Sequence, residues 1–351
     1  MGSIAFDRSH GGGAASDSLI DFSASTNPFG PPPALLDAYH RAAAAIGSYP
    51  EPYAATLTAA MAASLRVAPG NVLAGNGSTQ LIYLIARVLR PQRPFVVIPT
   101  FSEIANSLLT LPATPTPVLL RRERRFQLEM DAIDEALAAG ADALFLGRPN
   151  SPTGTTVDLA QMSTIAQRCA TRRCWCVIDE AFIEFADDPA SAVALVAAND
   201  RVIVLRSMTK LYAIPGLRLG YLVASGALVA ELARALEPWS VSGPAAAVGM
   251  ACLAQPDSWR EQSREALGAE RLHLEAGLGA IAGFEVFRST ANFLMFSAPA
   301  GSLPFPAHLC VQGLLVRDLA ALPGAGPGLY RAGVRSRADN GRLLEAARSY
   351  R

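Results

Sequence analysis

The chain has 351 residues, of which 51% are hydrophobic and 17% are charged, and its 30 basic side chains balance 30 acidic ones. This balance provides no general electrostatic drive toward nucleic acid or an anionic membrane, and no apolar run reaches the roughly 18 residues that span a membrane. We expect a soluble, cytoplasmic globular protein with about two domains, or one large α/β unit, and with no nucleic-acid or membrane partner.

The first thirty residues are expected to be irregular. Gly11-Gly12-Gly13, which follow His10, can adopt positive φ and let backbone amides converge on an anion. Asn27-Pro28 favours a turn. Taken alone, these letters also fit a flexible terminal arm, so both interpretations stay open.

Two helices and a glycine-rich turn come next. Apolar spacing predicts one helix from Pro33 to before Gly47 and another over residues 54–65. A short strand at 72–74 leads into a turn at 75–80, and a helical pattern follows over 81–89. Free backbone amides at the start of that last helix could bind a phosphate, but a Ser or Thr side chain that caps the helix explains the same letters.

Four further buried strands are expected at 95–98, 143–146, 176–178 and 202–205. Each is followed at once by residues suited to binding. These are Phe101, the amide Asn150 in a proline- and glycine-rich turn, the carboxylate Asp179, and the group Ser207, Thr209 and Lys210. Because strand, polar tip and helix recur, we predict a mostly parallel sheet covered by helices, with the tips where open α/β sheets bind ligands.

Lysine is the residue at these tips with the most specific chemistry. An amine such as that of Lys210 can form a Schiff base with an aldehyde, and Arg218 supplies a second cation eight residues later. Pyridoxal phosphate needs such a lysine together with hydroxyl and guanidinium donors for its phosphate. A loop with two solvated cations is the alternative for this stretch alone.

Five cysteines are scattered along the chain at positions 169, 174, 176, 252 and 310. No Cys or His pair completes a metal site with Cys174 and Cys176, so we expect reduced structural thiols and no metal. A redox pair at these two positions is the functional alternative.

The last third of the chain predicts helices and a small antiparallel sheet. Helices are expected over 227–236, from about 244 to 279, and from about Asp339. The sheet would contain the segments 284–287, 293–296, 314–317 and 329–335. Arg331 and Arg335, four residues apart, would then lie on the same side of one strand, as an anion-binding pair or a surface salt-bridge pair.

Taken together, the strand-end residues Asn150, Asp179 and Lys210 resemble the site of fold type I pyridoxal phosphate enzymes of the aminotransferase superfamily. Gly77-Ser78-Thr79 and Arg218 extend the resemblance, which covers nearly the whole chain. Within the superfamily, the chain is most similar to the branch of threonine-phosphate decarboxylases and histidinol-phosphate aminotransferases. The stretches that favour the decarboxylases are residues 10–12, 21–23, 27–28, 179–185, 206–221 and 238–241.

The resemblance implies an α/β large domain with a mostly parallel seven-stranded sheet between helices, and a small α+β domain. The N-terminal arm and part of the small domain would comprise residues 1–45, the large cofactor-binding domain 46–240, and the C-terminal small domain 241–351. The chain would form a homodimer in which Tyr49 reaches the phosphate bound by the partner subunit.

The resemblance also implies roles for the site residues. Lys210 would form the Schiff base with pyridoxal 5'-phosphate, Asp179 would face the pyridine nitrogen, and Asn150 would donate to the phenolic oxygen. Phe101 would stack on the ring, while Phe182 stands where related aminotransferases commonly have a tyrosine. The residues expected around the phosphate are Gly77, Ser78, Thr79, Ser207, Thr209 and Arg218.

For the substrate, Arg335 would bind the carboxylate with Arg331 beside it, and His10, Gly11 and Asn27 would close over a distal phosphate. Two letters depart from the family pattern near that phosphate, where Gly13 and Ser25 each replace an asparagine. They bear on the identity of the substrate and not on cofactor binding.

The resemblance favours decarboxylation of an O-phosphorylated amino acid, above all L-threonine O-3-phosphate to (R)-1-amino-2-propanol O-2-phosphate for cobalamin synthesis. A histidinol-phosphate-type aminotransferase and a specialised enzyme for a phosphonate or another amino acid are the alternatives. A non-catalytic binding protein of the same fold would be expected to lack the lysine, and Lys210 is present.

Overall fold

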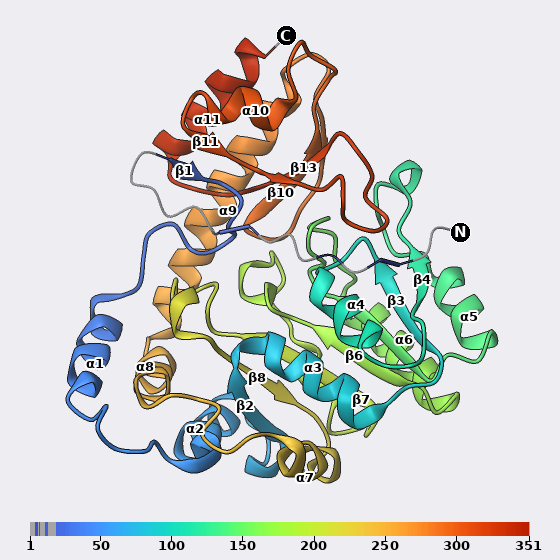
Figure 1. Cartoon of the computed structure of the whole chain (residues 1–351), viewed down its shortest axis with the longest axis vertical. Helices are drawn as coiled ribbons and strands as arrows, with labels where there is room; N and C mark the ends of the chain where they lie inside the picture. Colours follow the sequence, from blue (N-terminus) through green and yellow to red (C-terminus); the bar gives the residue numbers. More distant parts are fainter. Residues whose placement is uncertain (1–3, 6, 8–10, 13–18, 351) are drawn as a thin grey trace.

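The computed structural model describes residues 4–5, 7, 11–12 and 19–350. Its centre is a seven-stranded sheet with helices on both faces (Figure 1). The strands, in their order across the sheet, are β2 (Val72–Asn76), β8 (Leu219–Val223), β7 (Val202–Ser207), β6 (Trp175–Asp179), β5 (Ala143–Gly147), β3 (Pro94–Ile98) and β4 (Thr116–Leu119). Only β8 runs antiparallel to its neighbours, so the expected mostly parallel seven-stranded sheet is confirmed.

The central strands are apolar over most of their length because both faces of the sheet are covered. In β6, Val177 points into one core, while Cys176 and Ile178 point into the other. The first core is closed by α3 (Gly77–Leu89), α4 (Ser102–Leu109) and α7 (Gly226–Ala235). The helices that contribute to the second core are α1 (Pro33–Ala43), α2 (Ala55–Leu65), α5 (Met130–Ala138), α6 (Leu159–Thr171) and α8 (Gly243–Leu253).

A second, four-stranded antiparallel sheet lies above the first in Figure 1. Its strands, in order, are β12 (Arg317–Asp318), β13 (Leu329–Gly333), β10 (Phe293–Ser297) and β9 (Glu285–Phe287). It shares a separate core with α9 (Asp257–Gly279), α10 (Phe305–Cys310) and α11 (Arg337–Ser349). The N-terminal segment joins this region, because β1 (Ile20–Asp21) pairs in parallel with β11 (Leu314–Leu315).

Two expectations for the small sheet are wrong. The segment 314–317 does not form one strand of it, because Leu314 and Leu315 pair with β1 and only Arg317 and Asp318 pair with β13. Arg331 and Arg335 do not share a strand, since β13 ends at Gly333. At this end of the strand the Gly333 amide donates to Phe22 O, at 2.7 Å, on the N-terminal segment.

Among the described residues, no helix is both long and apolar enough to cross a membrane. All five cysteines are free, and four are buried, as expected for structural thiols. The cytoplasmic location and the domain boundaries at residues 45 and 240 stay predictions.

Candidate active site

The loop after β7 holds Lys210 in a fixed position. Ser207 and Thr209 are buried there, and their hydroxyl oxygens lie 2.8 Å apart in a hydrogen bond. The carbonyl of Lys210 accepts a 2.9 Å hydrogen bond from the Asn27 amide. The N-terminal segment therefore fixes the backbone from which the Lys210 side chain extends.

The surroundings of Lys210 lower the pKa of its amine, so a larger fraction of it is neutral than in an exposed lysine. Burial lowers the pKa of Lys210 to about 8, and the positive charges of Arg331 and Arg218 act in the same direction, while Asp179 opposes them. The Lys210 ammonium nitrogen also lies 5.6 Å from the centre of the Phe182 ring. An amine with this lowered pKa is a competent nucleophile toward an aldehyde near neutral pH.

Asp179 is the last residue of β6 and is buried. Burial raises the pKa of its carboxyl to about 6, and the charge of Glu180 adds to the effect. The Ala181 amide, which donates to Asp179 Oδ1 at 3.0 Å, and the charge of Lys210 act in the opposite direction. Near neutral pH, the site therefore pairs a carboxylate on β6 with an amine on the loop after β7.

Groups suited to a phosphate gather where α3 begins. Gly77 opens this helix at φ +76°, and a Cβ added to it would lie 2.6 Å from Arg218 Nη2. A Cβ added to Gly220 would lie 2.5 Å from the Ser78 amide nitrogen, so both glycines keep this corner open. The first amides of a helix point outward and carry the positive end of its dipole. The start of α3 and the Arg218 guanidinium thus form one cationic corner.

Asn150 is buried in the turn after β5, and its side chain is held by three hydrogen bonds. Its Nδ2 donates to Pro99 O at 2.8 Å and to Thr153 Oγ1 at 2.9 Å, and its Oδ1 accepts from Thr100 Oγ1 at 2.9 Å. Both amide hydrogens are therefore used within the protein. Donation to a bound cofactor would require Asn150 to exchange one of these partners.

These residues fit pyridoxal phosphate. The lysine can react with the aldehyde, the neighbouring carboxylate suits a ring nitrogen, and the cationic corner suits the phosphate. Two aromatic side chains lie at the same strand ends. Phe101 directly precedes α4. Phe182 is buried, and the centre of its ring lies 4.9 Å from the centre of the Phe293 ring in an edge-to-face arrangement.

Arg331 lies closer to this chemistry than Arg335 does. Arg331 Nη1 donates to Ser151 Oγ at 2.9 Å, beside Asn150, and its Nη2 donates to Ser23 O at 2.7 Å. Its charge contributes to the lowered pKa of Lys210. Arg335 instead pairs with Asp339 Oδ2 at 3.2 Å and donates to Asp21 O. The contacts favour Arg331 as the anion-binding arginine.

Arg317 is a site residue that sequence reasoning missed. It is the partner of Arg331 in the β12–β13 register, and its charge, together with burial, lowers the pKa of Arg331 to about 10. Asp7 lies 3.8 Å from Arg317. A second arginine in a short strand before β13 was visible in the sequence, but only the register shows that it faces Arg331.

The residues expected around a distal phosphate have mixed outcomes. His10 and Gly13 lie outside the described residues. The backbone at Gly11 is close to Ser23, since an added Cβ would lie 2.4 Å from Ser23 O, the same oxygen that Arg331 contacts. Ser25 is buried, and its Oγ has no hydrogen-bond partner among the described residues.

Asn27 serves the backbone in this structure. Its Nδ2 donates to Leu211 O at 3.0 Å and its Oδ1 accepts from the Phe29 amide at 3.1 Å. With the main-chain bond to Lys210 O, these contacts anchor the lysine loop. Its role in binding a substrate phosphate stays a prediction.

Tyr49 lies apart from these residues. It is 85% exposed, and its ring packs against Trp239 at 5.1 Å. Within one chain, Tyr49 is therefore on the surface, as a residue that serves a partner subunit would be.

Known proteins match this chain over nearly its whole length. Residues 17–346 match the family model for aminotransferase class I and II. The threonine-phosphate decarboxylase of Salmonella typhimurium is 36% identical over 354 residues, which cover 98% of this chain and 97% of that protein. Histidinol-phosphate aminotransferase 2 of Archaeoglobus fulgidus is 33% identical over 338 residues, with 94% and 92% covered. The crystal structure of the histidinol-phosphate aminotransferase from Clostridium acetobutylicum has a TM-score of 0.87 at 22% identity, covers 94% of this chain and 98% of that chain, and shares the fold.

Proposed function

The chain belongs to the aminotransferase class I and II family, and from this premise we propose that it decarboxylates an O-phosphorylated amino acid. Enzymes of this family depend on pyridoxal 5'-phosphate, which is the cofactor of this chain. L-threonine O-3-phosphate is the proposed substrate and (R)-1-amino-2-propanol O-2-phosphate the product, for use in cobalamin synthesis. The near full-length similarity to a threonine-phosphate decarboxylase supports this choice.

The observation that carries the proposal is the excess of positive charge around Lys210. The charges of Arg331 and Arg218 both lower the pKa of the Lys210 amine. Arg317 lies opposite Arg331 on the neighbouring strand β12. A cofactor phosphate occupies only one part of this field. A substrate with both a carboxylate and a phosphate suits the remainder, because arginine binds both groups through paired hydrogen bonds.

The chain's own residues have distinct tasks in this reaction. The start of α3, the Ser207 and Thr209 hydroxyls and Arg218 would hold the cofactor phosphate, while Asp179 would face the ring nitrogen. When bound, pyridoxal phosphate supplies an electron sink for the bond that breaks at the substrate's α-carbon.

Arg331 would bind and orient the substrate carboxylate through its guanidinium. Its contact with Ser151 fixes that guanidinium relative to the turn that holds Asn150. Lys210 Nζ can hold a proton and deliver it to the carbon that loses CO2.

A homodimer is part of the proposal. Exposed apolar side chains gather on and around α1, α2 and α8, which lie together at the lower left of Figure 1. They are Leu36, Tyr39, Ile46, Tyr49, Tyr53, Trp239 and Met250, and we call them the α1 surface. An exposed apolar set of this size suits a protein interface. A second copy covering it would bring Tyr49 toward the partner's cofactor phosphate.

Transamination is the second candidate, supported by the similarity to a histidinol-phosphate aminotransferase. The third is a specialised-pathway enzyme that acts on a phosphonate or another amino acid, which Gly13 and the Ser25 hydroxyl, without a hydrogen-bond partner among the described residues, motivate.

A paired assay separates these candidates. Purified, cofactor-loaded protein is given L-threonine O-3-phosphate with and without 2-oxoglutarate, and both CO2 and glutamate are measured. Release in both reactions, absent in Lys210→Ala, is the expected result. Turnover that requires 2-oxoglutarate would establish a transaminase, and no turnover with the cofactor bound would point to another substrate.

A further inference from the structure

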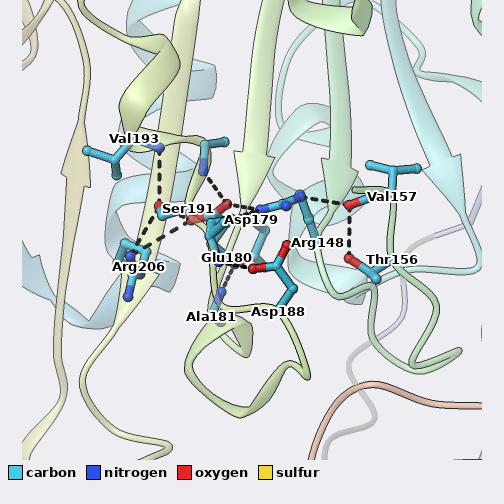
Figure 2. Close-up of polar contacts among 12 residues, drawn as sticks. Arg148, Thr156, Val157, Asp179, Glu180, Ala181, Asp188, Ser191, Val193 and Arg206 are labelled. Carbon is cyan, nitrogen blue, oxygen red and sulfur yellow. Dashed lines mark hydrogen bonds and ion pairs between the residues drawn. The ribbon is translucent and has the colours of Figure 1, made fainter. Parts of the chain in front are cut away.

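A buried charged cluster lies directly behind Asp179. Its core is Arg148, Glu180 and Arg206, which come from the ends of the adjacent strands β5, β6 and β7. Figure 2 shows Glu180 between the two arginines. None of these side chains has a task in the chemistry proposed above, yet all three are buried, so their contacts call for an explanation.

Glu180 is saturated with partners. Its Oε1 accepts from Arg148 Nη1 at 2.8 Å and from the Ala192 amide at 2.8 Å. Its Oε2 accepts from the Ser191 hydroxyl and lies 3.8 Å from Arg206 Nη1. Both carboxylate oxygens are therefore hydrogen-bonded, as buried polar groups generally are.

Among the described residues, Glu180 is the only carboxylate that pairs with Arg148. Its side chain is 1% exposed, and apart from Glu180 it donates only to the carbonyls of Val157, at 2.9 Å, and Ala190, at 2.7 Å. Arg206 is shared with Glu184, whose carboxylate is 3.4 Å away. Two arginines and two glutamates thus balance, with Arg148 paired to Glu180 alone.

The cluster and the active site lie on opposite faces of one strand end. Asp179 and Glu180 are consecutive, so their side chains project to opposite faces. The backbone ties the same point to both neighbouring strands, since Arg148 N donates to Asp179 O and Glu180 N donates to Leu205 O, each at 2.8 Å. Whatever holds Glu180 also fixes the peptide that carries Asp179.

We propose, resting on the cofactor role assigned to Asp179, that Arg148 and Glu180 are positioning residues that hold the end of β6 and set the charge behind the Asp179 carboxylate. Without Arg148, the Glu180 charge would be only partly compensated, and it would disfavour ionisation of its neighbour. Without the Glu180 charge, this opposition to the ionisation of Asp179 would be lost. Arg148 thereby keeps Asp179 available as the anion that a cofactor ring nitrogen requires.

Charged and titratable groups from the neighbouring strands and from α9 lie around Asp179 and its cluster. They are Arg148 after β5, Glu180 and Glu184 after β6, Arg206 on β7, Lys210 and Tyr212 after β7, Tyr221 on β8, Arg260 on α9 and Arg331 on β13. Of these, Glu180 and Lys210 act on the Asp179 carboxyl most directly, and burial has already raised its pKa to about 6.

The test measures the Asp179 carboxyl itself, in full-length apoprotein labelled with ¹³C at the aspartate carboxyl carbon. The signal that disappears in Asp179→Asn is followed by NMR as pH changes. Arg148→Met should raise the midpoint by about one pH unit, and Glu180→Gln should lower it by a similar amount. The double variant Arg148→Met/Glu180→Gln should titrate near the wild-type midpoint.

The opposite signs separate electrostatic positioning from loss of structure, because a purely structural role would move both variants in the same direction. Arg168→Met, which removes an exposed arginine paired with Asp134, is the matched control and should leave the midpoint unchanged. If Arg148→Met fails to fold, the isosteric Glu180→Gln still carries the test through its downward shift. Unchanged midpoints, or shifts of the same sign, would overturn the proposal. Because the readout needs neither cofactor nor substrate, it stands or falls separately from the CO2 assay.

Discussion

Arg331 on β13 donates a hydrogen bond to Ser151, one residue after Asn150, at 2.9 Å. This bond joins the small sheet directly to the turn that ends β5 of the large sheet. A second bond from Arg331, to Ser23 O, adds the N-terminal segment to the same point. Three separate parts of the chain therefore meet at the guanidinium that we assign to the substrate carboxylate.

Arg331 and Arg335 can be separated by mutation. Arg331→Gln should lower kcat/KM for L-threonine O-3-phosphate by at least roughly a hundredfold, because a charge-assisted bidentate contact is lost. Arg335→Gln should have a much smaller effect, since Arg335 already pairs with Asp339. Steady-state kinetics of both variants provide the measurement. A larger loss in Arg335→Gln than in Arg331→Gln would return the carboxylate role to Arg335.

Gly77 should be needed for cofactor affinity. A Cβ at this position meets the Arg218 guanidinium at 2.6 Å, so Gly77→Ala should displace Arg218 and weaken pyridoxal phosphate binding by roughly tenfold or more. Gly328→Ala is a matched control, because Gly328 has the same φ of +76° but nothing within 4 Å of an added Cβ. Cofactor titration of the apoproteins measures the effect. Equal weakening in both variants would mean that backbone strain alone is responsible.

Cofactor uptake by the apoprotein should depend on pH through Lys210. The pKa of Lys210 is lowered to about 8, so the neutral, reactive amine increases as pH rises through 8 and changes little above about 9. The rate of appearance of the cofactor's visible absorbance should follow this curve. Arg331→Met should shift the midpoint to higher pH, since the Arg331 charge helps to lower it.

Lys210→Ala should show no such absorbance and no turnover; retention of both would refute the assignment of Lys210.

The α1 surface should be a dimer interface. Ile46 is 75% exposed on it, and Ile46→Asp should convert the dimer to monomers by placing a charge in an apolar contact. Val311→Asp, at a position 80% exposed near the other end of the molecule, should leave the dimer intact. Light scattering after size-exclusion chromatography decides the outcome. A monomeric wild-type protein would contradict the dimer.

Five strands of the large sheet could be predicted from sequence because each is a short apolar run followed at once by a polar tip, whereas β8 was not among them. The tips at Asp179 and Lys210 were identifiable for the same reason. β4 was not predicted: it lies at the sheet edge, most of it is not buried, and Pro117 interrupts its pattern.

Contacts between segments that are distant in the sequence could not be predicted. The spacing of Arg331 and Arg335 predicted a shared strand, but β13 ends at Gly333, between them. The Arg148–Glu180 pair joins residues 32 positions apart, and only the alignment of β5 with β6 brings them together. The sequence Asn27-Pro28 predicted a turn, but it did not predict the hydrogen bond from Asn27 to Leu211 in the lysine loop, which joins positions 184 apart.

The fate of the substrate's α-hydrogen tests the proposed reaction most directly. Cofactor-loaded protein is incubated with L-threonine O-3-phosphate in D2O, and the product is examined by mass spectrometry and proton NMR. We expect an amine that has lost its carboxyl carbon, keeps its original α-hydrogen and gains a single deuterium at the same carbon. Loss or exchange of the α-hydrogen with the carboxyl group retained would contradict decarboxylation and identify a transaminase.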